Sequence, residues 1–173
     1  NPKTGAIIAM ATAPSFDPNN YSKVESYGVY SNLAINGTYE PGSVFKPLNM
    51  AAAIDAGGVN PETTYEDTGS VKIDKFTINN ALRKAYGVQT MTQTLEKSLN
   101  VGMVFVMNKL GIDRAYDYVT KFGFRALTGI DLDQESEGAI RDREKMKPID
   151  LATMGFGQGI DVTPIQVLSA FSA

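Results

Sequence analysis

A serine and a lysine three residues apart stand at the head of a long apolar run, and this stretch constrains the fold more than any other. The run covers residues 44–56 and ends at Gly57-Gly58, which predicts one buried helix with a glycine stop. Ser43 and Lys46 follow a Pro-Gly turn at its start. Because residues i and i+3 share one face of a helix, both side chains are expected to point the same way. A hydroxyl that faces an amine at a buried helix start is the arrangement of a serine nucleophile with a lysine base.

The spacing Ser-x-x-Lys is weak by itself, since serine commonly caps a helix and a lysine in a first turn is commonly solvated. Composition strengthens the catalytic interpretation. The 173 residues include no cysteine and no histidine. This excludes disulfides, thiolate chemistry, Ser-His-Asp catalysis and the usual zinc hydrolases. A serine enzyme of this composition takes its base from Lys, Asp, Glu or Tyr, and we expect no metal or cofactor.

The overall composition, 43% hydrophobic and 20% charged, is that of one globular domain. A net charge of −3 gives no electrostatic case for nucleic acid binding. No apolar run reaches the roughly 18 residues that a membrane span requires. The chain opens on Asn1 rather than Met, and the helix expected after Thr163-Pro164 has no stop signal before Ala173. Residues 1–173 are therefore expected to be a piece of a longer protein.

The rest of the chain is predicted to be mostly helical with little strand. Short strands are expected at residues 6–11, as a buried run, and at 71–73. Thr90 and Gln93 fit a capping box that opens a helix. Residues 60–69 are expected to be a loop, and residues 124–147 an irregular, charged and solvated surface. Further helices are expected at residues 77–85, 90–98, 100–110, 113–122 and 148–154, and residues 155–159 are expected to form a flexible turn.

A second polar pair, Ser98 and Asn100, lies at the junction of two of the expected helices. One interpretation is that either residue caps the second helix. The other is that the hydroxyl and the carboxamide both face a cleft. Local sequence favours the capping interpretation.

With their flanks, the two polar motifs resemble the first two active-site motifs of penicillin-binding proteins, Ser-x-x-Lys and Ser-x-Asn. The flanks resemble those of the class B, monofunctional transpeptidases. Residues 1–10 are similar to the strand that opens their transpeptidase domain, and residues 14–19 to the loop after it. Residues 157–166 resemble their later Gly-x-Gly…Thr-Pro-x-Gln segment. The matches follow the family's order over nearly the whole chain.

The resemblance implies an α+β fold: a helix-rich, partial β-lactamase/transpeptidase-like domain that lacks the C-terminal strands of the central antiparallel sheet. It also implies a mechanism. Ser43 would attack a D-Ala-D-Ala stem peptide, Lys46 would take its proton, and Ser98 would relay that proton to the leaving amine. Asn100 would hydrogen-bond the acyl part of the substrate. A neutral lysine near pH 7 requires a pKa roughly 3 units below the usual 10.4. Burial and a helix N-terminus act in that direction.

The implied partners are peptidoglycan stem peptides and the β-lactams that mimic their dipeptide end. The resemblance also places the parent protein at the outer face of the bacterial cytoplasmic membrane, held by an anchor outside this chain and working in a cell-wall synthesis complex.

The family's third motif, Lys-Thr-Gly, follows the Thr-Pro-x-Gln segment and is not found there. Lys3-Thr4-Gly5 precedes Ser43 and matches the opening turn of the domain, so we expect no catalytic role for Lys3. Without the third motif, the carboxylate-binding groups and one N–H of the oxyanion hole are missing. The chain alone is therefore expected to be inactive or poorly folded.

Three alternatives share parts of this pattern. A class A β-lactamase carries a catalytic glutamate between its second and third motifs, and no matching loop is recognised around Glu135, Glu137 or Glu144. A catalytically dead scaffold is expected to have lost Ser43 or Lys46, and both are present. A β-lactam sensor domain keeps both motifs and stays open as an alternative.

Overall fold

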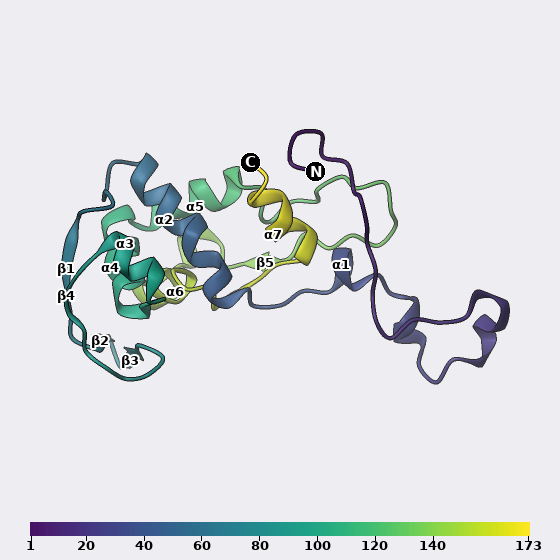
Figure 1. Ribbon diagram of the computed structural model, residues 1–173, viewed down its shortest axis with the longest axis horizontal. Helices are drawn as coiled ribbons and strands as arrows, with labels where there is room; N and C mark the ends of the chain where they lie inside the picture. Colours follow the sequence, from purple (N-terminus) through teal and green to yellow (C-terminus); the bar gives the residue numbers. More distant parts are fainter.

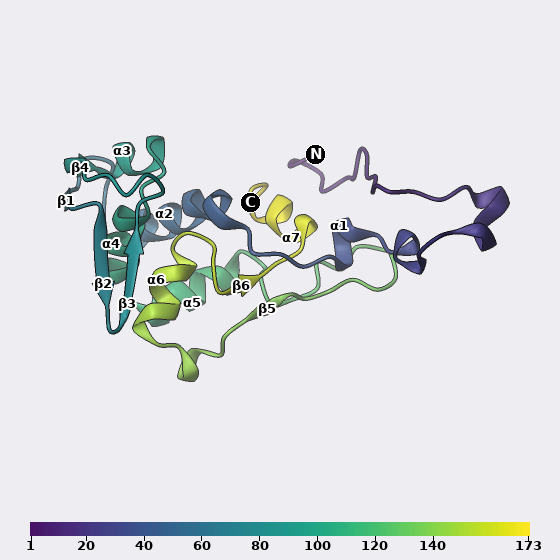
Figure 2. The same ribbon diagram turned by 90° about the horizontal axis from the view of Figure 1, so that it is seen from below.

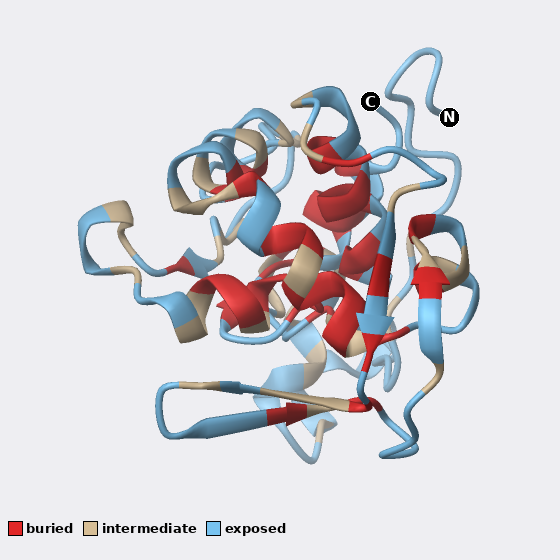
Figure 3. Ribbon diagram, turned by 90° about the vertical axis from the view of Figure 1, so that its left-hand side faces the viewer, coloured by how far each residue is buried: buried red, intermediate tan, exposed pale blue.

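The computed structural model describes all of residues 1–173 (Figure 1). The helices of its core pack around α4 (Asn100–Leu110). The apolar side chains of α4 are buried on nearly every face, which is the pattern of a core helix. Helices α2 (Lys46–Asp55), α5 (Ile112–Lys121) and α6 (Pro148–Met154) pack against it. Figure 3 shows that the buried residues gather on these inner helices. The structure is thus rich in helices and has only small antiparallel sheets, which confirms the α+β prediction.

Most of the predicted helices are confirmed, because their signals are local. The expected helix at residues 44–56 consists of a short 3-10 turn, η3 (Gly42–Phe45), that continues into α2. The predicted capping box of Thr90 and Gln93 opens α3 (Met91–Glu96), with both hydrogen bonds formed. Thr163 and Gln166 form a second capping box at the start of α7 (Pro164–Ala170). A short 3-10 turn, η4 (Arg143–Lys145), lies in the charged segment.

The strands form three separate antiparallel pairs. β1 (Thr64–Asp67) pairs with β4 (Gly87–Thr90), β2 (Ser70–Ile73) with β3 (Phe76–Asn79), and β5 (Ala139–Ile140) with β6 (Ile160–Asp161). The strand predicted at residues 71–73 is confirmed. The loop predicted at residues 60–69 is only partly correct, because it contains β1.

The helix predicted at residues 77–85 is wrong, because residues 76–79 form strand β3. Asp74 adopts the left-handed conformation (φ 51°), which allows the tight turn between β2 and β3. Ile78 lies opposite Val71 and is buried against Val104 and Phe156. Because Ile78 packs on the core from one face of the hairpin, residues 76–79 form a strand rather than the predicted helix.

The N-terminal part of the chain runs as an arm that projects beyond the helices (Figures 1 and 2). It contains two 3-10 turns, η1 (Pro18–Lys23) and η2 (Tyr27–Tyr30), and leads into the short helix α1 (Leu33–Asn36). The buried strand predicted at residues 6–11 is wrong: Ile7 is 47% and Ile8 82% exposed. No neighbouring segment pairs with its backbone, and an apolar run forms a strand only where another strand satisfies its N–H and C=O groups.

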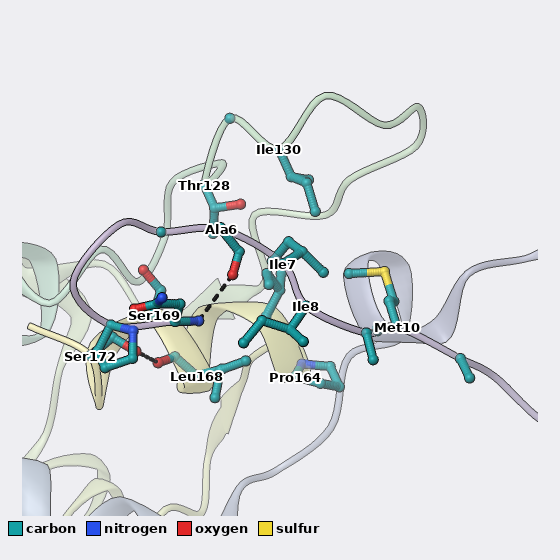
Figure 4. A pocket seen from close by; sticks show the side chains of 18 residues that line it. Ala6, Ile7, Ile8, Met10, Thr128, Ile130, Pro164, Leu168, Ser169 and Ser172 are labelled. Atoms are coloured by element: carbon teal, nitrogen blue, oxygen red, sulfur yellow. Dashed lines mark hydrogen bonds between the residues drawn. The ribbon is translucent and has the colours of Figure 1, made fainter.

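An apolar groove lies between this arm and α7 (Figure 4). Its volume is about 840 Å³. Ile7 and Ile8 face it from the arm, and Pro164 and Leu168 face it from α7. Leu168 is 61% exposed although it lies on a helix of the core. The groove therefore leaves apolar surface of two elements uncovered.

The prediction of an irregular, solvated surface at residues 124–147 is only partly correct. Most of the segment is exposed, but Phe124 and Ile140 are buried in the core and residues 139–140 form β5.

Exposed ion pairs link Arg125 and Lys145 to Asp142, at 3.1 and 2.8 Å. Such pairs contribute about 0–1 kcal/mol each, so they add little to stability. No helix of the chain has both the length and the apolar character to cross a membrane.

Candidate active site

Ser43 lies in η3, at the solvent-exposed start of the helix that continues as α2. The turn before it depends on two glycines. Gly42 has φ 60°, and its N–H donates to the carbonyl oxygen of Gly157 at 2.9 Å. A side chain on Gly157 would overlap the backbone of Gly42, and Gly157 itself has φ 72°. The turn at residues 155–159, predicted only as flexible, therefore holds the serine loop in place.

Lys46 follows one turn later and is buried, with 2% of its surface exposed. Its Nζ donates to three oxygens: the carbonyl of Ser98 at 2.7 Å, the Oγ of Ser98 at 2.9 Å and the Oδ1 of Asn100 at 2.8 Å. Burial, which penalises the charged amine, lowers the pKa of Lys46 from its usual 10.5 to about 8. A neutral fraction of the amine is therefore present near neutral pH.

Ser98 connects the lysine to the serine. Its Oγ donates to the Oγ of Ser43 at 3.2 Å and accepts from the Nζ of Lys46. The amine of Lys46 thus contacts Ser43 through Ser98, whereas the i, i+3 spacing suggested a direct contact. Ser43 and Ser98 are both exposed, while the amine lies beneath them. The arrangement is a continuous hydrogen-bonded path from a buried amine to an exposed hydroxyl.

The backbone of Ser98 explains why its hydroxyl reaches this position. Ser98 has φ 52°, in the left-handed region that favours glycine. Its N–H donates to the carbonyl oxygen of Leu95 at 3.1 Å, and the next N–H, of Leu99, donates to that of Thr94 at 2.9 Å. This is the Schellman arrangement that ends a helix, here α3, and its left-handed position is usually a glycine. A serine there is strained, by about 1 kcal/mol.

Neither Ser98 nor Asn100 caps α4, so the capping interpretation is wrong. The N-cap position belongs to Leu99, which has no capping side chain. The Nδ2 of Asn100 donates to the carbonyl oxygen of Asn79 at 2.9 Å, which turns its Oδ1 toward Lys46. Asn79 is a site residue that the sequence did not reveal, because residues 77–85 were predicted to be a helix.

The structure thus brings together all four candidate residues: Ser43, Lys46, Ser98 and Asn100. Lys3 lies elsewhere, in the exposed turn at the start of the chain, where its N–H donates to the side chain of Asn1. No three His, Cys, Asp or Glu side chains are grouped so that they would hold a metal ion. The apolar groove against α7 is also separate, since none of the four residues lines it.

The chain is similar to known proteins over its whole length. The family model described as the penicillin binding protein transpeptidase domain matches residues 1–173. The chain is 38% identical to stage V sporulation protein D of Bacillus subtilis, over all of this chain and 27% of that protein. It is 31% identical to peptidoglycan D,D-transpeptidase FtsI of Escherichia coli K12, over 98% of this chain and 28% of that protein.

Among solved structures, the chain resembles Pseudomonas aeruginosa PBP2, crystallised in complex with WCK 5153, with a TM-score of 0.89 and 28% identity. The match covers 99% of this chain and 44% of that one. The chain therefore spans under half the length of these relatives. Because the family model covers every residue, the chain belongs to the penicillin-binding protein transpeptidase family.

Proposed function

We propose that the protein containing this chain is a D,D-transpeptidase that cross-links peptidoglycan stem peptides through an acyl-enzyme on Ser43. The observation that carries the proposal is the path of hydrogen bonds from Lys46 Nζ through Ser98 Oγ to Ser43 Oγ. Relatives of the chain that are named peptidoglycan D,D-transpeptidases support the same reaction. β-Lactams, which mimic the D-Ala-D-Ala end, are expected to acylate the same serine.

In the proposed first step, Lys46 is neutral and has a lone pair in place of one of its three N–H groups. The hydrogen bonds along the path then reverse: Ser43 Oγ donates to Ser98 Oγ, Ser98 Oγ donates to Lys46 Nζ, and the proton of Ser43 passes through Ser98 to the amine. The Ser43 oxygen forms a bond to the carbonyl carbon of the penultimate D-alanine. The bond to the terminal D-alanine nitrogen breaks, and the proton held by Lys46 returns through Ser98 to that amine. An amine of a neighbouring stem peptide then forms a bond to the acyl carbonyl carbon, the bond from that carbon to Ser43 Oγ breaks, and the proton that the amine loses returns through Ser98 to Ser43 Oγ.

Asn100 is proposed to bind the acyl part of the substrate while it holds Lys46. Its amide nitrogen carries two N–H groups, and the contact with Asn79 uses one of them. The second N–H is available to a substrate carbonyl. Its oxygen, 2.8 Å from Lys46, fixes the amine beneath the serines.

We further propose that residues 1–173 are part of a larger transpeptidase domain, and that further strands of its sheet cover the groove between the arm and α7. The exposed apolar residues Ile7, Ile8 and Leu168 support this, because such surface is usually buried in a finished domain. The third motif and the second oxyanion N–H are expected on those strands. An anchor in the cytoplasmic membrane, action at its outer face and membership of a cell-wall complex rest on the family resemblance.

Replacing the nucleophile tests the proposed reaction. In the intact protein that carries this chain, Ser43→Ala is expected to abolish covalent labelling by a fluorescent penicillin, since no other group replaces the attacking oxygen. Ser22→Ala, at an exposed serine of η1, is the matched control and should label normally. Gel fluorescence after denaturation measures the covalent adduct. If Ser43→Ala labels as strongly as the unsubstituted protein, Ser43 is not the nucleophile.

The pKa of Lys46 predicts the pH dependence of acylation. A base acts in its neutral form, so the rate should rise with pH through the pKa of about 8 and level off above it. At pH 7 only about a tenth of the amine is neutral, which leaves about a tenth of the plateau rate. Stopped-flow acylation by a chromogenic β-lactam between pH 6 and 9.5 measures the profile. A rate that stays constant over that range would exclude Lys46 as the base.

The strain at Ser98 lets one substitution separate stability from activity. Ser98→Gly removes the relay hydroxyl and with it one acceptor of Lys46, but it also relaxes the left-handed position, so the melting temperature should change little. Acylation should fall by about 10²–10⁴-fold, as for the loss of a proton-transfer group. Gln134→Gly replaces another exposed residue of positive φ and controls for the added glycine. If the Ser98→Gly protein is acylated as fast as the unsubstituted protein, Ser98 does not relay the proton.

The groove provides a test of the larger domain. Ile8 is 82% exposed in this chain, so Ile8→Lys should be almost neutral if the groove faces water. If strands cover it, burying a lysine and losing the isoleucine should destabilise the intact protein by about 2 kcal/mol or more. Thermal unfolding decides, with Leu82→Lys, at a 78% exposed leucine, as the control. A melting temperature unchanged by Ile8→Lys would contradict coverage of the groove.

A further inference from the structure

The first turn of α4, which carries the second motif, is capped from a distant part of the chain. Leu99 at the N-cap offers no acceptor, and the helix N–H groups of a first turn need one. The N–H of Val101 donates instead to the Oδ1 of Asn80 at 3.1 Å. Asn80 lies just after β3 and is only 3% exposed. A buried side chain from the β3 end thus replaces the missing cap.

A buried carboxylate fixes the orientation of that side chain. The Nδ2 of Asn80 lies 2.9 Å from both carboxylate oxygens of Asp67, at the end of β1. Asp67 is 1% exposed and also accepts the N–H of Tyr86 at 3.0 Å. None of the ion pairs in the structure includes it. A carboxylate buried among neutral donors is a strong, directional acceptor. It therefore fixes the Asn80 amide with its nitrogen toward Asp67 and its oxygen toward Val101.

The residue next to Asn80 holds the neighbouring group of the motif. The carbonyl oxygen of Asn79 accepts from the Nδ2 of Asn100, whose Oδ1 contacts Lys46 Nζ at 2.8 Å. Two successive residues at the end of β3, Asn79 and Asn80, therefore hydrogen-bond to two successive residues of α4. Any shift of Asn80 would move both contacts together.

We propose that Asp67 and Asn80 are positioning residues that place Ser98 and Asn100 against Lys46. Neither touches the reacting atoms; they act through the start of α4. The inference rests on the proposed function, since its consequence for rate is read as acylation of Ser43. Its structural consequence, the Lys46–Asn100 contact, does not depend on which reaction the site performs.

Exchange of the two side chains separates positioning from simple stability. Asp67→Asn sets two amide groups against each other, and Asn80→Asp buries two carboxylates side by side. The double variant again pairs one carboxylate with one amide, but the amide is at position 67 and the carboxylate at position 80. The new carboxylate at position 80 would then accept both from the new amide at position 67 and from the N–H of Val101.

The experiment measures acylation by a chromogenic penicillin at saturating concentration in the intact protein, at a temperature where circular dichroism finds every variant folded. Asn80→Ala and both single exchanges should each slow acylation by about 10–100-fold, as expected for a misplaced catalytic group. The double exchange should return to within about threefold, since the two changes are coupled. Gln166→Ala removes a buried amide that bridges the carbonyls of Ala126 and Glu137, remote from α4, and should acylate normally at a comparable loss of melting temperature.

Two results would overturn the inference. One is full acylation by Asn80→Ala and the single exchanges; the other is a double exchange that regains its melting temperature but not its rate. A crystal structure of the intact Asp67→Asn protein, the mildest change, gives a readout independent of activity. Displacement of Asn100 Oδ1 from Lys46 supports the inference, and an unchanged contact overturns it. If the unsubstituted protein does not react with penicillin, the proposed function fails, and this structure alone decides the positioning role.

Discussion

The buried amine of Lys46 is the constraint on which the site depends. A charged or polar group removed from water destabilises the fold unless hydrogen bonds replace its solvation. Here the hydrogen bonds come from two residues around the start of α4, Ser98 and Asn100, whereas Lys46 lies at the start of α2. No carboxylate neutralises the amine, so burial keeps its pKa near 8. The same contacts therefore join two helices, while burial lowers the pKa of the amine that they hold.

The surrounding fold holds one unfavourable backbone conformation and one close approach of two backbone segments. Ser98 occupies a left-handed position where glycine is usual, and Gly157 packs directly on the backbone of Gly42. Each feature brings a group of the site to its place: the hydroxyl of Ser98 in one case and the turn of Ser43 in the other. Strain of about 1–3 kcal/mol persists only where the surrounding structure compensates for it. Helix α4 and its neighbours supply that compensation through their buried packing.

Local signals made much of the fold predictable, and long-range pairing explains the errors. The apolar run after Ser43 and the capping box of Thr90 describe elements that a few neighbouring residues determine. The strand expected at residues 6–11 and the helix expected at 77–85 failed because pairing and burial involve distant segments. Within the site, the motifs and the family resemblance identified the four residues that the structure brings together. Two sets of hydrogen bonds depend on tertiary contacts that no local pattern contains. One set links Lys46 through Ser98 to Ser43, and the other links Asn79 and Asn80 to α4.

The central claim is that the hydrogen-bonded path from Lys46 through Ser98 ends on one reactive oxygen, that of Ser43. The most direct measurement is peptide mapping by tandem mass spectrometry after the intact protein has reacted with benzylpenicillin. The account predicts a single penicilloyl adduct, on Ser43, in the peptide that also contains Lys46. An adduct on Ser98, on Lys46 or on a residue outside this path would contradict it.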